Sequence, residues 1–418
     1  AVVLFWEACS NDISMEAPPA FGHSMRSEFS MAENFTNMNH GAYGSTPRRV
    51  LQAQWNYMLR MENDINQWMR LPEGYKGEIV KARRKVAKYI NAPEEDVVLI
   101  DNASNGINLL LRDWLWKATS VILDLSTGYG PFKAYYQWLG ATKEVETVTV
   151  KVKFPVSSND DIVLPFQKTL ARVKSEGKHP VVIVSQVSSS PAIVLPVGKI
   201  VALCKAAAVP VIVDGAHALG AVPVDIHAMQ PDFWFGNGHK WLYAPHTVAA
   251  LYVSKKYQTA YTPEPTVVDS FGDNFTTRFA WDGTRDRTAF AAMQDAFAFR
   301  EWIGGEAAIL NYTYSLSRKG ADYLVQAWGT GMLAPHSMQA TMHNVRVPTN
   351  STAACTYVGQ GLYEQYGIFV FAISMDDIPC YLRVHSQIYL DMSDYHRLAK
   401  ATMDLLRDFH GQNEAALV

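Results

Sequence analysis

Near its midpoint the chain reads Val211-Ile212-Val213-Asp214-Gly215-Ala216-His217, a run of β-branched residues that ends in a carboxylate. Such a short apolar run is typical of a strand that is buried on both faces. Similar runs precede it at 97–100, 121–123 and 181–184, with amphipathic segments between them. Because helices must cover both faces of such a sheet, we predict a doubly wound α/β domain built on buried parallel strands.

Polar residues follow these runs at the points where the strands are predicted to end. In open α/β sheets, ligands bind beyond the carboxyl ends of the strands, which is where Asp124, Asp214 and the segment 101–104 fall. Farther along, the chain reads Gly238-His239-Lys240-Trp241. Each piece alone is weak, because a strand-terminal Asp is commonly a helix cap and a lone Lys is usually a solvated charge.

Together, Asp214 and Lys240 meet the needs of pyridoxal phosphate. The cofactor withdraws electrons from a substrate carbanion only while its ring nitrogen is protonated, and an ionised carboxylate beside that nitrogen keeps it so. A lysine condenses with the cofactor aldehyde only when unprotonated, which a desolvated site promotes by lowering its pKa. We therefore predict that Asp214 contacts the ring nitrogen and that Lys240 holds the cofactor as a Schiff base.

Three longer motifs carry a family resemblance, at 39–47 (NHGAYGSTP), 238–242 (GHKWL) and 281–286 (WDGTRD). From about Asn37 to its C-terminus the chain resembles fold-type-I pyridoxal-phosphate enzymes of the class V aminotransferase superfamily. The branch is that of isopenicillin-N epimerase-like proteins and C–S lyases, including ergothioneine-type cysteine-conjugate lyases. The resemblance implies an N-terminal extension (1–36), a large cofactor-binding domain (37–285) with a mixed, mostly parallel sheet, and a smaller C-terminal α+β domain (286–418).

The resemblance also implies a set of cofactor contacts and a homodimer with shared active sites. The phosphate-binding turn matches Ala103, Ser104 and Asn105, and the ring that stacks on the cofactor matches Tyr129. The contacts to the phenolic oxygen match Ser189 and His217, and a pair that contacts the phosphate matches Asn237 and His239. The loop that reaches the phosphate from the partner subunit matches Gly283 and Thr284. Ordinary alternatives are a plain helix cap at Ser104, a packed ring at Tyr129 and a core histidine at His217.

The substrate side of the site is predicted from the segment 381–389 and from the first motif. An arginine on a strand offers a rigid fork to a carboxylate, so Arg383 is the candidate anchor for the substrate carboxylate. The ordinary alternative is a surface ion pair. We also predict substrate contacts from His40, Tyr43 and Tyr389, although aromatic residues of this kind more often pack in cores or interfaces.

The motifs leave the outcome of the reaction open. The first hypothesis is a C–S lyase that eliminates sulfur from a cysteine conjugate or sulfoxide, giving pyruvate and ammonia; the second is an epimerase-like enzyme of secondary metabolism, including carbon–carbon bond formation; the third is an aminotransferase. A persulfide mechanism is disfavoured because Cys355 lies in a helical pattern and Cys380 lies just before Arg383. A non-catalytic cofactor-binding scaffold is disfavoured by the intact Asp214, Lys240 and Arg383, and a nicotinamide-binding protein by the lack of Gly-x-Gly-x-x-Gly.

The composition of the chain restricts the kinds of partner that we expect the protein to bind. With 37 basic and 40 acidic residues and no basic block, we expect neither nucleic acid nor a membrane surface as a partner. Four widely spaced cysteines argue against a disulfide framework or a thiolate metal site, so we expect no metal and a reducing, cytoplasmic location. The apolar run at 1–6 is too short to span a membrane.

Overall fold

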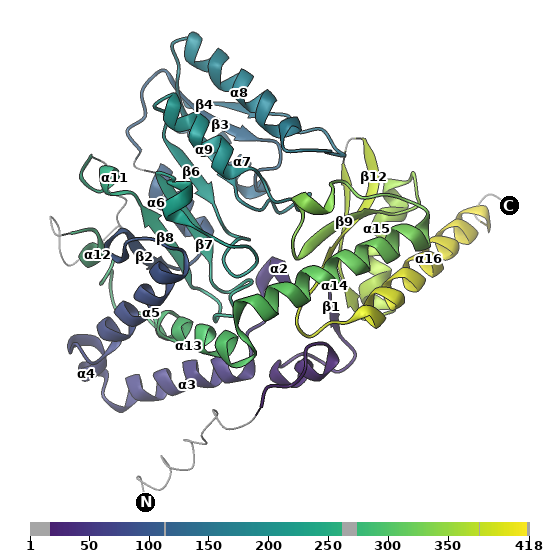
Figure 1. The fold of residues 1–418 in the computed structure, drawn as a ribbon, viewed down its shortest axis with the longest axis horizontal. Coiled ribbons are helices and arrows are strands. Elements are labelled where there is room, and N and C mark those ends of the chain that lie inside the picture. Colours follow the sequence, from purple (N-terminus) through teal and green to yellow (C-terminus); the bar gives the residue numbers. More distant parts are fainter. Residues whose placement is uncertain (1–16, 113, 261–273, 376, 416–418) are drawn as a thin grey trace, which may run out of the picture.

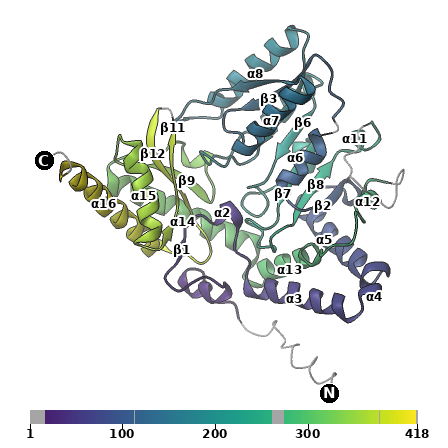
Figure 2. The same ribbon diagram turned by 180° about the vertical axis from the view of Figure 1, so that it is seen from behind.

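The computed structural model describes residues 17–112, 114–260, 274–375 and 377–415. They form a large seven-stranded sheet with helices on both faces, followed by a three-stranded sheet with helices packed against it (Figures 1 and 2). The apolar run at 1–6 and Cys9 lie outside the described residues. No described helix has the length and apolar character that crossing a membrane would require.

The seven-stranded sheet has the order β2-β8-β7-β6-β5-β3-β4. Its strands are β2 (Val97–Ile100), β3 (Ser120–Leu125), β4 (Glu146–Val150), β5 (His179–Ser185), β6 (Val211–Asp214), β7 (Phe233–Asn237) and β8 (Ala249–Val253). The predicted runs at 97–100, 121–123, 181–184 and 211–213 all form strands. Nearly all residues of these strands are buried, which confirms the α/β class with a mixed, mostly parallel sheet.

The sheet is covered on both faces, and alternate residues of each strand supply two separate cores. One core joins the sheet to α5 (Tyr75–Tyr89), α8 (Asp160–Ser175) and α9 (Val197–Ala206). The other joins it to α6 (Ala103–Leu111), α7 (Gly130–Lys143) and α12 (Phe275–Arg278). Short helices α10 (Ile226–Met229) and α11 (Lys255–Ala260) complete the connections.

Two strand pairings make the sheet mixed, as predicted. Strand β2 pairs antiparallel with β8, and β8 also pairs antiparallel with β7. Because β8 alone is reversed, β2 still runs in the same direction as β7 and β6. The carboxyl ends of β2, β3, β6 and β7 therefore meet at one edge of the sheet, and this edge is where the polar residues gather.

The C-terminal part begins with the long helices α13 (Thr288–Trp302) and α14 (Gly305–Trp328). An antiparallel sheet of order β11-β12-β9 follows, built from β9 (Met342–Arg346), β11 (Phe371–Met375) and β12 (Ile378–His385). Helices α15 (Thr352–Glu364) and α16 (Met392–Ala415) pack beside it (Figure 1). Just before β11, the short strand β10 (Ile368–Phe369) belongs to a separate two-stranded sheet.

A disulfide joins Cys355 of α15 to Cys380 of β12, with the two Cα atoms 5.3 Å apart. The prediction that the cysteines form no disulfide is therefore wrong for this pair. Spacing along the chain could not reveal it, because the two residues meet only when α15 packs on the sheet. The argument from cysteine spacing for a reducing compartment falls with it, and a cytoplasmic location stays a prediction.

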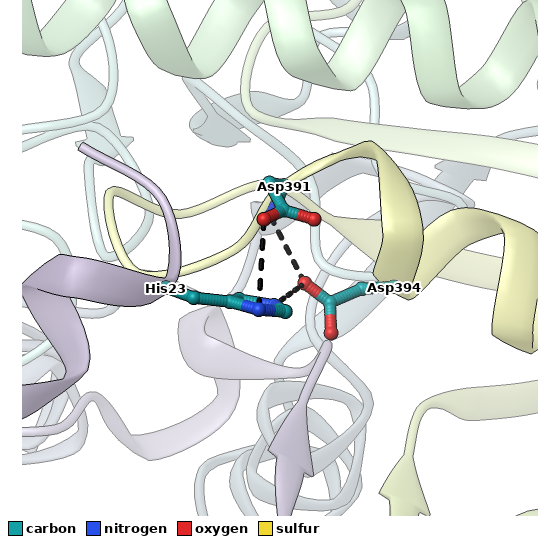
Figure 3. Close-up of side chains that lie close together, drawn as sticks. All are labelled: His23, Asp391 and Asp394. Carbon is teal, nitrogen blue, oxygen red and sulfur yellow. Dashed lines mark hydrogen bonds and ion pairs between the residues drawn. The ribbon is translucent and has the colours of Figure 1, made fainter.

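The N-terminal segment packs against the main core through Phe21, Met25 and Phe29. It contains the 3-10 helix η1 (His23–Glu28) and β1 (Thr36–Asn37), which pairs with β10. Figure 3 shows His23 beside Asp391 and Asp394 at the start of α16; the nearest contact joins His23 Nε2 to Asp394 Oδ2 at 2.9 Å. Helices α2 (His40–Tyr43), α3 (Arg48–Asn63) and α4 (Ile65–Arg70) then lead into α5.

Candidate active site

A cavity of about 360 Å³ lies at the carboxyl edge of the large sheet. Most of the residues predicted to form the site line it: Tyr43, Ala103, Ser104, Tyr129, Ser189, Asp214, His217, Asn237, His239 and Lys240. These residues come from the ends of several strands and from α2. The segments that contribute them are far apart in the sequence. The sheet thus brings together the two weak sequence signals, the strand-terminal Asp214 and the later Lys240.

Lys240 follows β7 and directs its amine at His217. The Lys240 Nζ atom lies 3.1 Å from His217 Nε2, while the indole N–H of Trp241 donates to His217 Nδ1 at 3.4 Å. Because Nδ1 accepts a hydrogen bond, the neutral imidazole carries its proton on Nε2. That proton points at the Lys240 nitrogen, which can accept it only in molecules whose lysine is unprotonated.

The charges around the lysine are consistent with this arrangement. Burial lowers the pKa of Lys240 to about 8, an effect that the charge of Arg383 reinforces and that of Asp214 opposes. Burial, with the neighbouring charge of Lys240, also holds the pKa of His217 well below its ordinary value. A neutral imidazole beside a partly neutral amine is the state in which a lysine can attack a carbonyl.

Asp214 ends β6 and is buried beneath the cavity. Its Oδ1 accepts the backbone N–H of Ala216 at 2.9 Å, and its Oδ2 accepts the Ser185 hydroxyl at 3.3 Å. Burial raises the pKa of Asp214, because two hydrogen bonds and the charge of Lys240 only partly replace the water it has lost. A cation placed against this carboxylate would therefore be strongly stabilised.

The N-terminus of α6 forms one wall of the cavity. The Asn102 side chain caps the helix by accepting the N–H of Asn105 at 2.8 Å, and Asn237 Oδ1 accepts the N–H of Ala103 at 2.9 Å. Neither bond uses the N–H or the hydroxyl of Ser104, which lines the cavity. A helix N-terminus with free N–H groups is a favourable place for a phosphate. Asn237 is thus placed to hold this turn.

Tyr129 and His239 also line the cavity. Tyr129 immediately precedes α7, and its ring packs edge-on against Phe132 with centroids 5.4 Å apart while remaining partly exposed. Burial lowers the pKa of His239 to about 4, and its Nδ1 atom is buried without a hydrogen-bond partner. A buried polar atom without a partner at a cavity wall indicates a contact that a ligand would complete.

Arg383 lies on β12, behind Ser189, and does not line the cavity itself. Its Nη1 donates to the backbone oxygen and the hydroxyl of Ser189, at 2.6 and 3.0 Å, and its Nη2 donates to Asn39 Oδ1 at 2.7 Å. The alternative of a surface ion pair is wrong, because the side chain is buried and its described hydrogen-bond partners are Ser189 and Asn39.

His40 and Tyr389, predicted as substrate contacts, are fully buried and do not line the cavity. His40 Nδ1 accepts the Tyr389 hydroxyl at 2.9 Å, and its Nε2 donates to the backbone oxygen of Lys240 at 2.7 Å. Burial lowers the pKa of His40 to about 4, so it holds the lysine segment as a neutral ring. In this structure the two residues support the Lys240 segment, and their contact with substrate stays a prediction. Tyr43, by contrast, is 74% exposed at the cavity edge.

Three further predicted residues lie outside this cavity. Asn105 lines a neighbouring cavity on the other side of the α6 N-terminus. Gly283 and Thr284 occupy an exposed loop in which Gly283 has a φ of +109°, a conformation that favours glycine. The assignment of these two residues to a partner subunit's site therefore remains a prediction.

Sequence reasoning missed several supporting residues. Asn39 and Gly41 stand in the quoted N-terminal motif but received no role. Gly41 is required because an added Cβ would lie 2.5 Å from the Trp241 ring. Trp241 itself orients His217, and Ser185 binds Asp214. The available signals in the sequence were the glycine of the first motif, Gly41, and the aromatic residue next to the lysine, Trp241. The residues that they contact are far away in the sequence, so the contacts could not be predicted.

The model of the aminotransferase class-V family matches residues 38–372. The chain belongs to this family. It is 29% identical to a probable chloroplastic L-cysteine desulfhydrase of Arabidopsis thaliana, across 92% of this chain and 86% of that protein. It is 28% identical to the hercynylcysteine sulfoxide lyase of Schizosaccharomyces pombe (92% and 97%) and 25% identical to the isopenicillin N epimerase of Streptomyces clavuligerus (87% and 93%).

Solved structures show the same fold. A cysteine desulfurase from Thermococcus onnurineus NA1, in its apo form, superposes with a TM-score of 0.76 at 17% identity, covering 94% of this chain and all of that one. The cystine C–S lyase C-DES, solved with its product cysteine persulfide, gives a TM-score of 0.70 at 21% identity over 88% of this chain and 98% of that one. These likenesses confirm the fold-type-I architecture.

Proposed function

We propose that this class V enzyme is a pyridoxal-phosphate-dependent C–S lyase that eliminates sulfur from Cβ of a cysteine conjugate or sulfoxide. The observation that carries the proposal is the Lys240 amine, which lies 3.1 Å from His217 and whose pKa burial lowers to about 8. The choice of elimination rests on relatives named as cysteine desulfhydrases and as a sulfoxide lyase, which match nearly the whole chain.

The residues present fit the cofactor. Asp214 is a buried carboxylate that lacks a full set of partners, so it suits a protonated ring nitrogen. The free donors at the start of α6 and the unpartnered Nδ1 of His239 suit a phosphate group. Tyr129, at the cavity wall, offers a partly exposed ring for stacking. When bound, pyridoxal phosphate supplies an electron-withdrawing ring that stabilises negative charge at the substrate Cα.

The chain's own residues would then perform three tasks. Arg383 binds the substrate carboxylate and thereby fixes the direction of the Cα–H bond. Lys240 Nζ would accept the Cα proton, because burial lowers its pKa to about 8 and so leaves part of the amine unprotonated near neutral pH. Loss of the sulfur group from Cβ leaves an enamine product, whose tautomerisation and hydrolysis give pyruvate and ammonia.

A persulfide route through a protein thiol is not supported by the described residues. No described cysteine lines the cavity: Cys355 and Cys380 are joined to each other, and Cys204 is buried in α9. Epimerisation is the second candidate, favoured by the likeness to an isopenicillin N epimerase. It would use the same proton removal at Cα but return the proton on the opposite face. Transamination ranks third.

We also propose a homodimer with shared active sites. Among the described residues that line the cavity, Lys240 is the only basic side chain besides histidines, so a phosphate dianion needs further donors. An exposed stripe on α3, formed by Leu51, Trp55 and Leu59 at 40–52% exposure, begins just after Tyr43 at the cavity edge. A second copy packed on this stripe would bury these three apolar side chains.

The test is to supply the purified enzyme, loaded with cofactor, with S-substituted cysteines and their sulfoxides while assaying pyruvate and ammonia. We expect both products in equal amounts, and none from the Lys240→Ala variant. Racemisation of the amino acid without pyruvate would replace elimination by epimerisation. Failure to bind pyridoxal phosphate at all would overturn the proposal.

A further inference from the structure

Arg383 is a buried cation that no described anion neutralises. Its side chain is 2% exposed, and each of its hydrogen-bond partners is a neutral oxygen, from Ser189 or Asn39. Its Nε atom is buried and has no partner. Burial lowers the pKa of Arg383 to about 10, which expresses how poorly its charge is compensated. Buried arginines are usually paired with carboxylates, so this environment is unusual.

Asn39 stands where such a carboxylate would be expected. Its Oδ1 lies 2.7 Å from Arg383 Nη2, in the direction from which an aspartate of the same shape would form an ion pair. The asparagine is itself buried and is held by its own backbone N–H, which donates to Asn37 Oδ1 at 3.0 Å. Asn39 therefore orients the guanidinium but does not neutralise its charge.

The remaining donors of Arg383 suggest how the charge is used. Ser189 engages Nη1 twice and Asn39 engages Nη2 once, which leaves Nε–H and one N–H of Nη2. In a guanidinium group, Nη2 lies on the Nε–H side, so a carboxylate that reached this side would meet both Nε and Nη2. The ring of Phe371 covers one face, with its centroid 4.9 Å from Cζ, and so restricts the approach to the guanidinium plane.

We propose that Asn39 is a specificity-determining residue: its neutral amide aims Arg383 while keeping the guanidinium charge for substrates that carry an α-carboxylate. This inference rests on the proposed function, because it concerns the substrate of that same site. An aspartate at position 39 would satisfy Arg383 permanently and would repel an incoming carboxylate. The choice between amide and acid at this one position thus sets whether the site recognises amino acids.

The test compares Asn39→Asp with wild-type holoenzyme, using L-alanine and ethylamine as probes. The two differ only in the carboxylate, and neither carries a sulfur leaving group, so dissociation constants can be read from the cofactor's visible absorbance. We expect Asn39→Asp to weaken L-alanine binding by roughly 30-fold or more while changing ethylamine binding by less than about 3-fold. Equal effects on both ligands, or none on L-alanine, would overturn the proposal.

Two controls separate charge from structure. Asn37→Asp adds the same charge two residues away without contacting Arg383, and Asn39→Leu removes the hydrogen bond without adding charge. Both should keep a clear preference for L-alanine over ethylamine. If Asn39→Asp does not fold, acetate competition in the wild-type enzyme decides: acetate should compete with L-alanine, and its failure to compete would refute an unneutralised Arg383. A wild-type enzyme that responds to neither amine would instead refute the proposed function.

Discussion

Lys240 is expected to react with aldehydes along a pH profile centred near 8, well below that of an exposed lysine. The structure lowers its pKa from 10.5 to about 8, mainly through burial. This lowering of the pKa corresponds to about 3 kcal/mol between the two protonation states of the lysine. At pH 7 the unprotonated fraction rises from roughly 0.03% to roughly 10%, which is an increase of about 300-fold.

The assay should report the lysine without involving the ring-nitrogen partner. Salicylaldehyde has no ring nitrogen, so imine formation between it and the apoprotein can be followed by absorbance from pH 6 to 10. The rate should rise about tenfold per pH unit below 8 and level off above it. Lys240→Ala should leave only the background rate of the surface lysines, which continues to rise toward pH 10.

Two variants fix the signs of the electrostatic effects. The charge of Asp214 raises the pKa of Lys240, so Asp214→Asn should move the midpoint below that of the wild type. The charge of Arg383 lowers it, so Arg383→Gln should move the midpoint upward. A wild-type midpoint near 10, or an upward shift in Asp214→Asn, would refute the reasoning.

Two further outcomes follow from the packing. Trp55→Glu places a charge in the exposed stripe of α3 and should convert a dimer into monomers, as measured by sedimentation. The control Leu164→Glu, on the exposed surface of α8, should leave the dimer intact. A dimer that survives Trp55→Glu would rule out this interface. Replacing Cys355 and Cys380 with Ser should lower the free energy of unfolding by about 3 kcal/mol in oxidising buffer, because the bond closes a loop of 25 residues. In denaturant without reductant, thiol titration should not detect these two cysteines, and full reactivity of both would contradict the pairing.

Local sequence patterns were sufficient for the large sheet and for the centre of the site. Runs such as 181–184 and 211–213 are short, β-branched and apolar throughout. A strand that is buried on both faces needs apolar side chains at every position, and these runs are typical of it. Since the carboxyl ends of parallel strands meet at one edge, the position of Asp214 after its strand already predicted where it would lie. Lys240 was placed by the motif around it and by the chemistry it must share with Asp214.

Tertiary structure decided what depends on pairs of residues far apart in the chain. The reversal of β8, the Cys355–Cys380 bond and the support of Lys240 by His40 leave no periodic trace in the sequence. Asn39 and Arg383 are 344 positions apart. Whether a buried arginine meets an acid or an amide is fixed by how α2 packs against β12, because hydrogen bonding depends on distance in space and the sequence specifies that distance only through the completed fold.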